Sequence, residues 1–270
     1  MTAASEIAPA KLNLALHVRG RLPDGRRAIE TIFAFCTDGD RLTGEAADEF
    51  TLEIAGPFAC DLEGEEDNLV LKAGHALAEA AGVDAGAALT LDKRLPIASG
   101  LGGGSADAAA ALRLLTALWG IHPKYAEQVA PVLGSDVPAC LLSFPVRGER
   151  AGDVLTPIAL PELSGRPVLL VNPRIPVSTA EVYGKWDGMD CGPLHHWRDG
   201  GRNDLYPLAR MIAPRIGDVM KWLDAQPGTN FVRMSGSGPT CFAFFDSESE
   251  RDAAAAAVPS EWWHLATFLR

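Results

Sequence analysis

A length of 270 residues allows one large domain or two ordinary ones, and 47% hydrophobic with 22% charged residues is typical of a soluble globular protein. The formal net charge of −11 argues against a general nucleic-acid binder, which would need a basic face, but leaves room for a local basic pocket. The N-terminal segment has no positively charged n-region and no apolar h-region, and no apolar run approaches about 18 residues. We therefore expect a cytoplasmic protein without a membrane span.

The cysteines and histidines give no metal-ligand pattern. The five cysteines are far apart and form no CxxC pair, which favours free thiols in a reducing compartment over disulfides or a metal site. The six histidines show no ligand spacing either. No metal site built from protein side chains is predicted.

The first half of the chain mixes strands with helices. Alternating apolar residues predict strands at 11–18, 28–36, 50–56 and 87–96, with a turn at 23–25. Helical spacing begins at Asp67, a plausible N-cap, and ends before Gly82. The strand predicted at 87–96 leads into a glycine-rich loop and a second helix. That helix has one apolar stripe, formed by Ala108, Ala111, Leu112, Leu115 and Leu118.

The second half repeats the mixture in a different order. Strands are predicted at 166–172, 230–236, 239–245 and 262–269, and helices around 178–185, 203–225 and 247–257. This order of strand, helices, two strands, helix and strand suits a ferredoxin-like α+β unit. The segment after Arg150 is rich in proline and glycine, so we place a domain boundary near residue 155.

The stretch LPIASGLGGGSADAAAAL, residues 95–112, places four glycines in five positions directly before a helix start. Glycines let backbone N–H groups turn toward a ligand, and a first helical turn adds unpaired donors with a partial positive charge. Phosphate is the usual guest of such a site. Ser105 could cap the helix or reach a phosphate or its metal. A plain flexible turn needs fewer glycines and is disfavoured.

Neither common phosphate loop fits this stretch. The dinucleotide fingerprint G-x-G-x-x-G matches only loosely because Ser105 stands at the last glycine, and the preceding DKRLP is too polar for a central parallel strand. A Walker A loop needs Gly-Lys-Ser/Thr, which is absent. The sequence thus predicts a phosphate loop of another kind.

The segment PIASGLGGGSADAA resembles the ATP-binding motif of the GHMP small-molecule kinases, P-x-x-x-G-L-x-x-S-[SA]-A. The segments APAKLNLALHV and MSGSGPTCFAFF resemble two further motifs of that superfamily, in the expected order. The segments PAKLNL, EEDNLVLKA, DKRLPIASGLGGGSADAA, LGSDVP, VSTAEVY and NDL resemble one branch of it. That branch phosphorylates the 2-hydroxyl of a cytidine-diphosphate-linked methylerythritol, in the non-mevalonate isoprenoid pathway. The resemblance runs from about residue 7 to residue 246.

The resemblance implies an α+β, two-domain GHMP kinase fold. The N-terminal domain, 1–155, would be ribosomal-protein-S5-like and would hold the catalytic lysine, the phosphate loop and the catalytic aspartate; the C-terminal domain, 156–270, would be ferredoxin-like. ATP would lie on the loop formed by Pro96, Ile97, Ala98, Ser99, Gly100, Leu101, Gly102, Gly103, Gly104, Ser105 and Ala106. Lys93 and Asn68 resemble residues that line the nucleotide base pocket. Mg²⁺ would arrive with ATP, held mostly by phosphate oxygens.

The implied catalytic residues are Lys11, which matches the lysine of the first motif, and Asp136, which matches the family's catalytic aspartate. Asp136 would orient the acceptor hydroxyl and accept its proton, with Lys11 close to both. From the residues alone other roles remain open. A lysine on a strand is often a solvated edge charge, and an aspartate before Val137 and Pro138 is often a helix N-cap.

The acceptor site departs from the family pattern. Tyr183 matches an aromatic residue that stacks on the substrate's cytosine, and Asn13 is expected to bind substrate. Where the family commonly reads Asp-Gly-Tyr-His, PDGRRAIET places Arg26 and Arg27 at the tyrosine and histidine positions. One possibility is another acceptor, and a second is a pair of solvated turn arginines. We favour a third, in which Arg26 stacks on cytosine opposite Tyr183 and Arg27 reaches the cytosine carbonyl or the diphosphate.

The resemblance implies an ATP-dependent kinase that is a monomer or weak homodimer, with no nucleic-acid or membrane partner. Two alternatives remain: a superfamily kinase for homoserine, mevalonate or a sugar, and a nucleotide-binding regulator without turnover. The presence of both Lys11 and Asp136 argues against the regulator.

Overall fold

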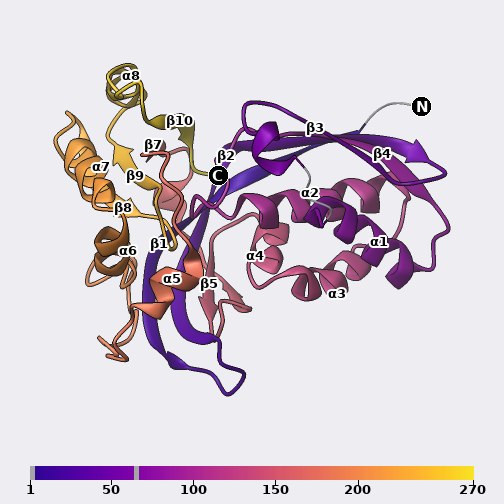
Figure 1. Ribbon diagram of the computed structural model, residues 1–270, viewed down its shortest axis with the longest axis horizontal. Helices are drawn as coiled ribbons and strands as arrows, with labels where there is room; N and C mark the ends of the chain where they lie inside the picture. Colours follow the sequence, from indigo (N-terminus) through magenta and orange to yellow (C-terminus); the bar gives the residue numbers. More distant parts are fainter. Residues whose placement is uncertain (1–3, 64–66) are drawn as a thin grey trace. The chain divides into compact units, whose positions relative to one another are not determined.

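The computed structural model describes residues 4–63 and 67–270 (Figure 1). Its strands are β1 (Ala4–Arg21), β2 (Arg27–Ala47), β3 (Thr51–Ala55), β4 (Gly86–Asp92), β5 (Val146–Glu149), β6 (Val154–Pro157), β7 (Pro167–Asn172), β8 (Thr229–Met234), β9 (Cys241–Phe245) and β10 (Trp263–Phe268). Its α-helices are α1 (Leu69–Ala81), α2 (Gly103–Leu118), α3 (Lys124–Leu133), α4 (Val137–Leu142), α5 (Thr179–Gly184), α6 (Tyr206–Ile212), α7 (Arg215–Asp224) and α8 (Glu248–Ala256). None of these helices is long and apolar enough to cross a membrane. Glu65 and Glu66 of the EEDNLVLKA segment lie outside the described residues.

Two compact units are built from interleaved segments of the chain. The first unit comprises Met1–Ala10, Asp38–Ile97 and Gly102–Ser143, and the second comprises Lys11–Thr37, Ala98–Leu101 and Phe144–Arg270. Strands β1 and β2 and the glycine loop each contribute to both units. The boundary near residue 155 divides the chain by consecutive sequence instead, and it stays a prediction.

In the first unit, β4 pairs with β3 in parallel and with the second half of β2 antiparallel, and the helices α1–α4 pack against one another (Figure 1). The predicted apolar stripe of α2 is confirmed for Ala108, Ala111, Leu112 and Leu115, which are all fully buried. Leu118 is only half-buried, at the last turn. Because small alanines allow close helix approach, α2 is buried on nearly all sides.

Helix α1 begins one residue later than predicted. Asn68 rather than Asp67 is the N-cap, because the Asn68 side chain accepts a hydrogen bond from the Val70 N–H at 2.9 Å. The predicted end is confirmed: Gly82 has the left-handed φ of 64° that commonly closes a helix.

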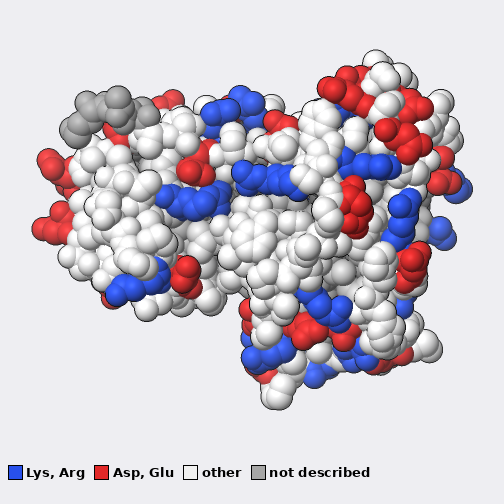
Figure 2. Space-filling model, turned by 180° about the vertical axis from the view of Figure 1, so that it is seen from behind, with Lys and Arg blue, Asp and Glu red and all other residues white. Residues whose placement is uncertain are grey.

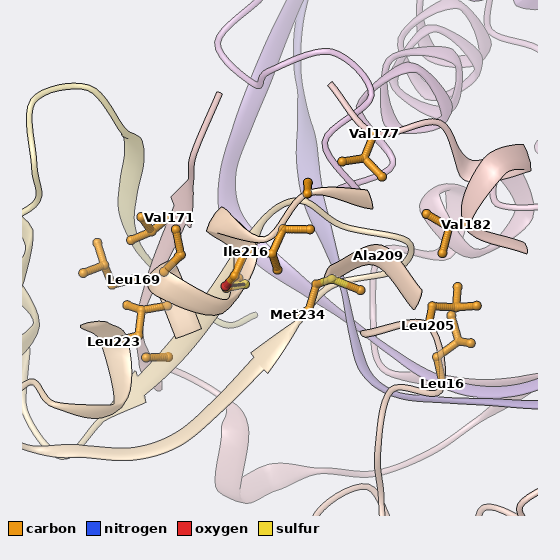
Figure 3. Close-up of a cluster of buried hydrophobic side chains, with 14 of the residues drawn as sticks. Leu16, Leu169, Val171, Val177, Val182, Leu205, Ala209, Ile216, Leu223 and Met234 are labelled. Atoms are coloured by element: carbon orange, nitrogen blue, oxygen red, sulfur yellow. Dashed lines mark hydrogen bonds between the residues drawn. The ribbon is translucent and has the colours of Figure 1, made fainter. Parts of the chain in front are cut away.

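The second unit contains a four-stranded antiparallel sheet in the order β10-β7-β9-β8. With α8 between β9 and β10, this is the ferredoxin-like arrangement that the element order predicts. Helices α7 and α8 contact the sheet. Figure 3 shows the core of this unit, in which side chains from several elements converge: Leu16, Leu169, Val171, Val177, Val182, Leu205, Ala209, Ile216, Leu223 and Met234.

Several details differ from the pattern-based expectation, beginning with β1 and β2, which are longer than the strands predicted at 11–18 and 28–36. The helix predicted over 203–225 is two helices, since Pro214 cannot continue α6 and instead stands at the N-cap position of α7. Strand β4 ends at Asp92, so the polar 93–96 segment is loop. Strands β5 and β6 and helix α3 have short or mixed patterns that gave no clear sequence signal.

The cysteines are free thiols, as their spacing predicts: Cys36, Cys140 and Cys241 are buried, and Cys60 and Cys191 are exposed. Acidic and basic side chains are interspersed over the face drawn in Figure 2. Neither feature marks a functional site by itself.

Candidate active site

The glycine loop turns the chain by left-handed backbone angles at alternate residues. Ala98, Gly100 and Gly102 have φ of 50°, 78° and 66°. A left-handed φ is unstrained for glycine but costs energy for alanine, and such strain is typical of functional loops. Gly102 is followed directly by helix α2, and no side chain caps that helix.

The first part of the loop is held by hydrogen bonds within the second unit. The Lys11 N–H donates to the Leu101 carbonyl at 2.9 Å, and the Thr240 N–H donates to the Ser99 carbonyl at 3.2 Å. The buried Ser235 hydroxyl donates to the Gly100 carbonyl at 2.9 Å. These contacts join the three segments that resemble the GHMP motifs, so the SGSGP turn shapes the loop.

The start of α2 presents free backbone donors. The Ala106 N–H bonds to the Gly102 carbonyl at 2.8 Å, so the N–H groups of Gly103, Gly104 and Ser105 precede the first intrahelical bond. Gly104 is exposed, and Gly103 and Ser105 are half-buried. This geometry suits an anion at the helix N-terminus.

Lys11 is buried in β1, with its side chain 4% exposed. Its ammonium donates to Asn13 Oδ1 at 2.9 Å and lies 5.1 Å from the centre of the Phe33 ring. Asn13 Nδ2 donates to Thr31 Oγ1 at 2.8 Å, and Thr31 Oγ1 donates to the Ala15 carbonyl at 2.7 Å. This chain of bonds fixes the Asn13 amide, so its oxygen faces the ammonium. Lys11 is therefore not a solvated edge lysine.

Asp136 stands at the N-cap position of α4 and is half-buried. Its backbone is helical, with φ of −88° and ψ of −16°, and its side chain makes no capping hydrogen bond. An N-cap aspartate normally has an extended backbone and accepts from the first turn. The capping interpretation of Asp136 is therefore wrong for this structure, and its catalytic role stays a prediction.

Lys93 lies in a buried ion-pair bridge of the first unit. Its ammonium is 2.6 Å from Asp40 Oδ2 and 2.5 Å from Asp107 Oδ2, and all three side chains are buried. The two carboxylates raise the pKa of Lys93 above its ordinary value despite burial. Burial raises the pKa of Asp107 to about 8; the Lys93 charge opposes this shift, and the Asp40 charge adds to it. A direct contact of this ammonium with a nucleotide would need the bridge to open.

Asn68 is also engaged, as the cap of α1 described above, and it is buried. Its Oδ1 is occupied by the Val70 N–H. A role of Asn68 and Lys93 in the base pocket stays a prediction.

Arg27 and Tyr183 come together in the second unit. One guanidinium nitrogen of Arg27 donates to the main-chain carbonyl of Tyr183 at 2.8 Å, and the guanidinium lies 5.0 Å from the Trp186 ring centre. Burial lowers the pKa of Arg27 from its ordinary value. Arg26 is instead exposed and forms ion pairs with Asp24 and Asp153 at 2.9 and 3.1 Å. The sandwich of cytosine between Arg26 and Tyr183 stays a prediction, and it requires Arg26 to leave these partners.

Sequence reasoning missed Thr31, Asp40, Asp107 and Trp186 as members of these networks. Asp107 carried a signal, since a single carboxylate stands among alanines where α2 is buried. Asp40, Thr31 and Trp186 carried none, because their contacts depend on strand register or on loop path. In residues 4–63 and 67–270, no group of three or more His, Cys, Asp or Glu could hold a metal.

Comparisons with known proteins agree with the motif order. The model of the GHMP kinases N terminal domain matches residues 68–144, and that of the GHMP kinases C terminal domain matches residues 195–264. The 4-diphosphocytidyl-2-C-methyl-D-erythritol kinase of Rhizorhabdus wittichii is 50% identical, over 98% of this chain and 94% of that protein. The kinase of the same name from Novosphingobium aromaticivorans is 45% identical, over 98% and 92%.

Solved structures give the same assignment. A crystal structure of a 4-(cytidine 5'-diphospho)-2C-methyl-D-erythritol kinase is 33% identical, with a TM-score of 0.83 over 98% of this chain and 99% of that one. The mevalonate kinase of Methanococcus jannaschii, at 12% identity and a TM-score of 0.70, shares the fold alone. The chain therefore belongs to the 4-diphosphocytidyl-2-C-methyl-D-erythritol kinases of the GHMP kinase family and is a small-molecule kinase.

Proposed function

We propose that this kinase transfers the γ-phosphate of ATP to the 2-hydroxyl of 4-diphosphocytidyl-2-C-methyl-D-erythritol, in the non-mevalonate isoprenoid pathway. The observation that carries the proposal is the hydrogen bond of the Lys11 N–H to the Leu101 carbonyl. It ties the strand that holds the motif lysine to the loop that precedes the free N–H groups of α2. The similarity to named relatives over nearly the whole chain supports this acceptor.

Phosphoryl transfer depends on positioning and on neutralising charge. The ATP phosphates accept hydrogen bonds from the N–H groups of Gly103, Gly104 and Ser105. The Lys11 ammonium, oriented by Asn13, stabilises the charge on the transferred phosphoryl group.

Asp136 holds the acceptor hydroxyl in line. The hydroxyl oxygen forms a bond to the γ-phosphorus while the bond from that phosphorus to the β–γ bridging oxygen breaks. ADP leaves with that electron pair, and the hydroxyl proton passes to the Asp136 carboxylate and then to water. Since the transition state is loose, the proton leaves late and Asp136 contributes mainly by orientation.

The residues at the start of α2 fit a magnesium ion that arrives with ATP. Within the described chain the Ser105 hydroxyl forms no hydrogen bond, so it is available as an oxygen ligand beside the phosphates. Phosphate oxygens would supply most other ligands. When bound, Mg²⁺ neutralises charge on the phosphates.

The acceptor's cytidine diphosphate group would be bound by Arg27 and Tyr183, with Trp186 supporting the Arg27 guanidinium from one face. Arg27 would reach the cytosine carbonyl or the diphosphate. We further propose a cytoplasmic monomer or weak homodimer that needs no nucleic-acid or membrane partner.

The test is ADP release from ATP with a panel of acceptors: the cytidine-diphosphate-linked methylerythritol, homoserine, mevalonate, a sugar and none. We expect release with the first at least about 10²-fold faster than with the others, since buried polar groups reject substrates that leave them unpaired. A Lys11→Met control keeps an unbranched side chain in place of the lysine but removes the ammonium beside Phe33, and it should lose this turnover, which excludes a contaminating kinase. A better rate with another acceptor contradicts the acceptor, and ATP binding without ADP release indicates the regulator.

A further inference from the structure

The strongest feature that the proposed chemistry leaves unused is the buried bridge of Asp40, Lys93 and Asp107. Its three side chains come from β2, from the residue after β4 and from α2. Their side chains are 0%, 1% and 5% exposed, so the bridge is closed to solvent. Taking several charged groups out of water is costly, and apolar residues of similar volume often stabilise a fold as well or better. Such a bridge is better explained by the geometry that it fixes.

Asp40 fixes the chain where β4 ends. Its Oδ1 accepts the N–H groups of Arg94 at 2.6 Å and Leu95 at 2.8 Å, while its Oδ2 accepts from Lys93. The two Asp40 carboxylate oxygens thus accept hydrogen bonds from three consecutive residues, 93–95. Asp40 therefore helps to hold the path of the chain from β4 into the glycine loop.

Asp107 connects the same ammonium to α2. It lies four residues after Gly103, on the same face of the helix and one turn further on. A Cβ atom at Gly103 would lie 3.1 Å from Lys93 Nζ and 3.7 Å from Asp40 Oδ2. The bridge therefore lies against the buried side of the first turn of α2. Because Gly103 has no side chain, the bridge can come close to the helix backbone there.

We propose that Asp40, Lys93 and Asp107 are positioning residues for ATP: the bridge fixes the first turn of α2 against the end of β4, so that the N–H groups of Gly103, Gly104 and Ser105 point at the phosphates. This inference rests on the proposed function, because it assigns the phosphates to that turn. Lys93 then acts through the helix and does not itself touch the nucleotide. Lys93 would thus have an indirect role in ATP binding in place of the expected contact with the nucleotide base.

The decisive variant is Asp107→Leu. Leucine has nearly the shape of aspartate, and the Lys93–Asp40 pair remains intact, so the fold should persist while α2 loses its link to Lys93. We expect the KM for ATP to rise about 10–100-fold, as for loss of one charge-assisted hydrogen bond, with a smaller change in kcat and in the acceptor KM. Asp107→Asn keeps an oxygen that accepts from Lys93 and should restore most of the ATP affinity.

A matched control separates positioning from loss of stability. Leu115→Ala also alters a fully buried side chain of α2, two turns further on, and should lower stability without changing the KM for ATP. Equal KM values for Asp107→Leu and the unmodified enzyme, or equal KM increases for Asp107→Leu and Leu115→Ala, would overturn the proposal. If Asp107→Leu is insoluble, the smaller and polar Asp107→Ser breaks the same link, and the same outcomes apply.

A readout without nucleotide keeps this inference distinct from the proposed function. Amide hydrogen exchange at Ala106, whose N–H bonds to Gly102, should speed up in Asp107→Leu and not in Leu115→Ala. If the unmodified enzyme fails to bind ATP, the proposed function is wrong, and the bridge is judged by exchange alone. Unchanged exchange at Ala106 in Asp107→Leu overturns the bridge's role whatever the ligand is.

Discussion

At the scale of single residues, two buried lysines near the glycine loop are held by hydrogen bonds to named side chains. Lys11 donates to Asn13 Oδ1, and Lys93 donates to the carboxyl groups of Asp40 and Asp107. Hydrogen bonds from a charged group are strong and fix its position. The two carboxyl groups at Lys93 support a structural role for that residue.

Asp136→Asn should lower kcat and leave ATP binding intact, and the loss should reach roughly 10²–10⁴-fold if acceptance of the acceptor's proton by the carboxylate matters to the rate. Asp136 makes no capping hydrogen bond, so Asp136→Asn removes no cap from α4. The contrasting control is Ser247→Ala: the Ser247 side chain caps α8, so its loss should cost about 1 kcal/mol without affecting kcat. Steady-state kinetics and urea unfolding measure both. An unchanged kcat in a folded Asp136→Asn protein would contradict the assignment.

The raised pKa of Asp107 predicts how stability depends on pH. With the pKa of Asp107 raised to about 8 in the folded protein and at its ordinary value of 3.8 in the unfolded chain, we expect the folded state to hold this proton over a pH range in which the unfolded chain has released it. Between these values the folded state binds more protons, so this group's contribution to stability is full below the lower pKa and is lost as pH rises through the upper one. The slope is at most about 1.4 kcal/mol per pH unit.

Urea unfolding of the unmodified protein and of Asp107→Asn, measured from pH 5 to about 8.5, isolates this contribution. The difference in the free energy of unfolding between the two proteins should shift steadily with pH, because asparagine does not titrate. A constant difference over that range would mean that Asp107 is ionised in the folded state.

Arg27→Ala should raise the KM for the cytidine-diphosphate acceptor by about 10–100-fold, as expected for a charged hydrogen-bond donor, and leave the KM for ATP nearly unchanged. Arg166→Ala is the matched control in the same unit, since Arg166 pairs only with Asp246 at 3.3 Å among the contacts found for the described chain. Acceptor and ATP titrations measure both constants. If Arg27→Ala leaves both unaffected, the two arginines after PDG are structural.

At the scale of elements, the glycine loop is shaped by what it touches as well as by its backbone angles. A Cβ atom at Gly100 would lie 2.4 Å from the Ser235 carbonyl oxygen and 2.8 Å from that of Gly238. Gly82, at the end of α1, has a similar left-handed φ but no atom within 4 Å of its Cβ position. A substitution at Gly82 therefore tests backbone strain alone, whereas a substitution at Gly100 tests backbone strain together with close packing.

Gly82→Ala should therefore cost about 1 kcal/mol of stability, from the left-handed backbone alone. Gly100→Ala should cost about 2 kcal/mol more, because the loop must move away from the SGSGP turn, and it should also weaken ATP binding. Thermal unfolding and ATP titration of both variants provide the measurement. Equal losses in the two variants would show that the packing of Gly100 has no energetic weight.

At the scale of the whole molecule, a ligand that binds only the folded state raises its stability by mass action. ATP at about 100 times its dissociation constant should add about 2.7 kcal/mol, which corresponds to a rise of about 5–10 °C in Tm for a protein of this size. Asp136→Asn should keep this shift, whereas Asp107→Leu should show a smaller one at the same ATP concentration. A Tm independent of ATP would refute nucleotide binding at the loop.

The sequence by itself determined the features that depend on neighbouring residues. The end of α1 at Gly82, the apolar stripe of α2 and the ferredoxin-like order of the second half all follow from short-range steric and periodic rules. The motif segments likewise indicated the family, because each motif is a local signature. Errors such as Asp67 for Asn68 arose where two adjacent residues both satisfied the local rule.

The tertiary structure alone decided which distant groups meet. In the antiparallel ladder of β2 and β4, Arg41 lies opposite Asp92, so one step further the chain brings Asp40 beside Lys93, 53 residues away. A register shifted by one residue would turn the Asp40 carboxylate to the other face of the sheet. The bridge under the glycine loop, and the engagement of Lys93 there, therefore depend on strand register, which no local pattern around either residue specifies.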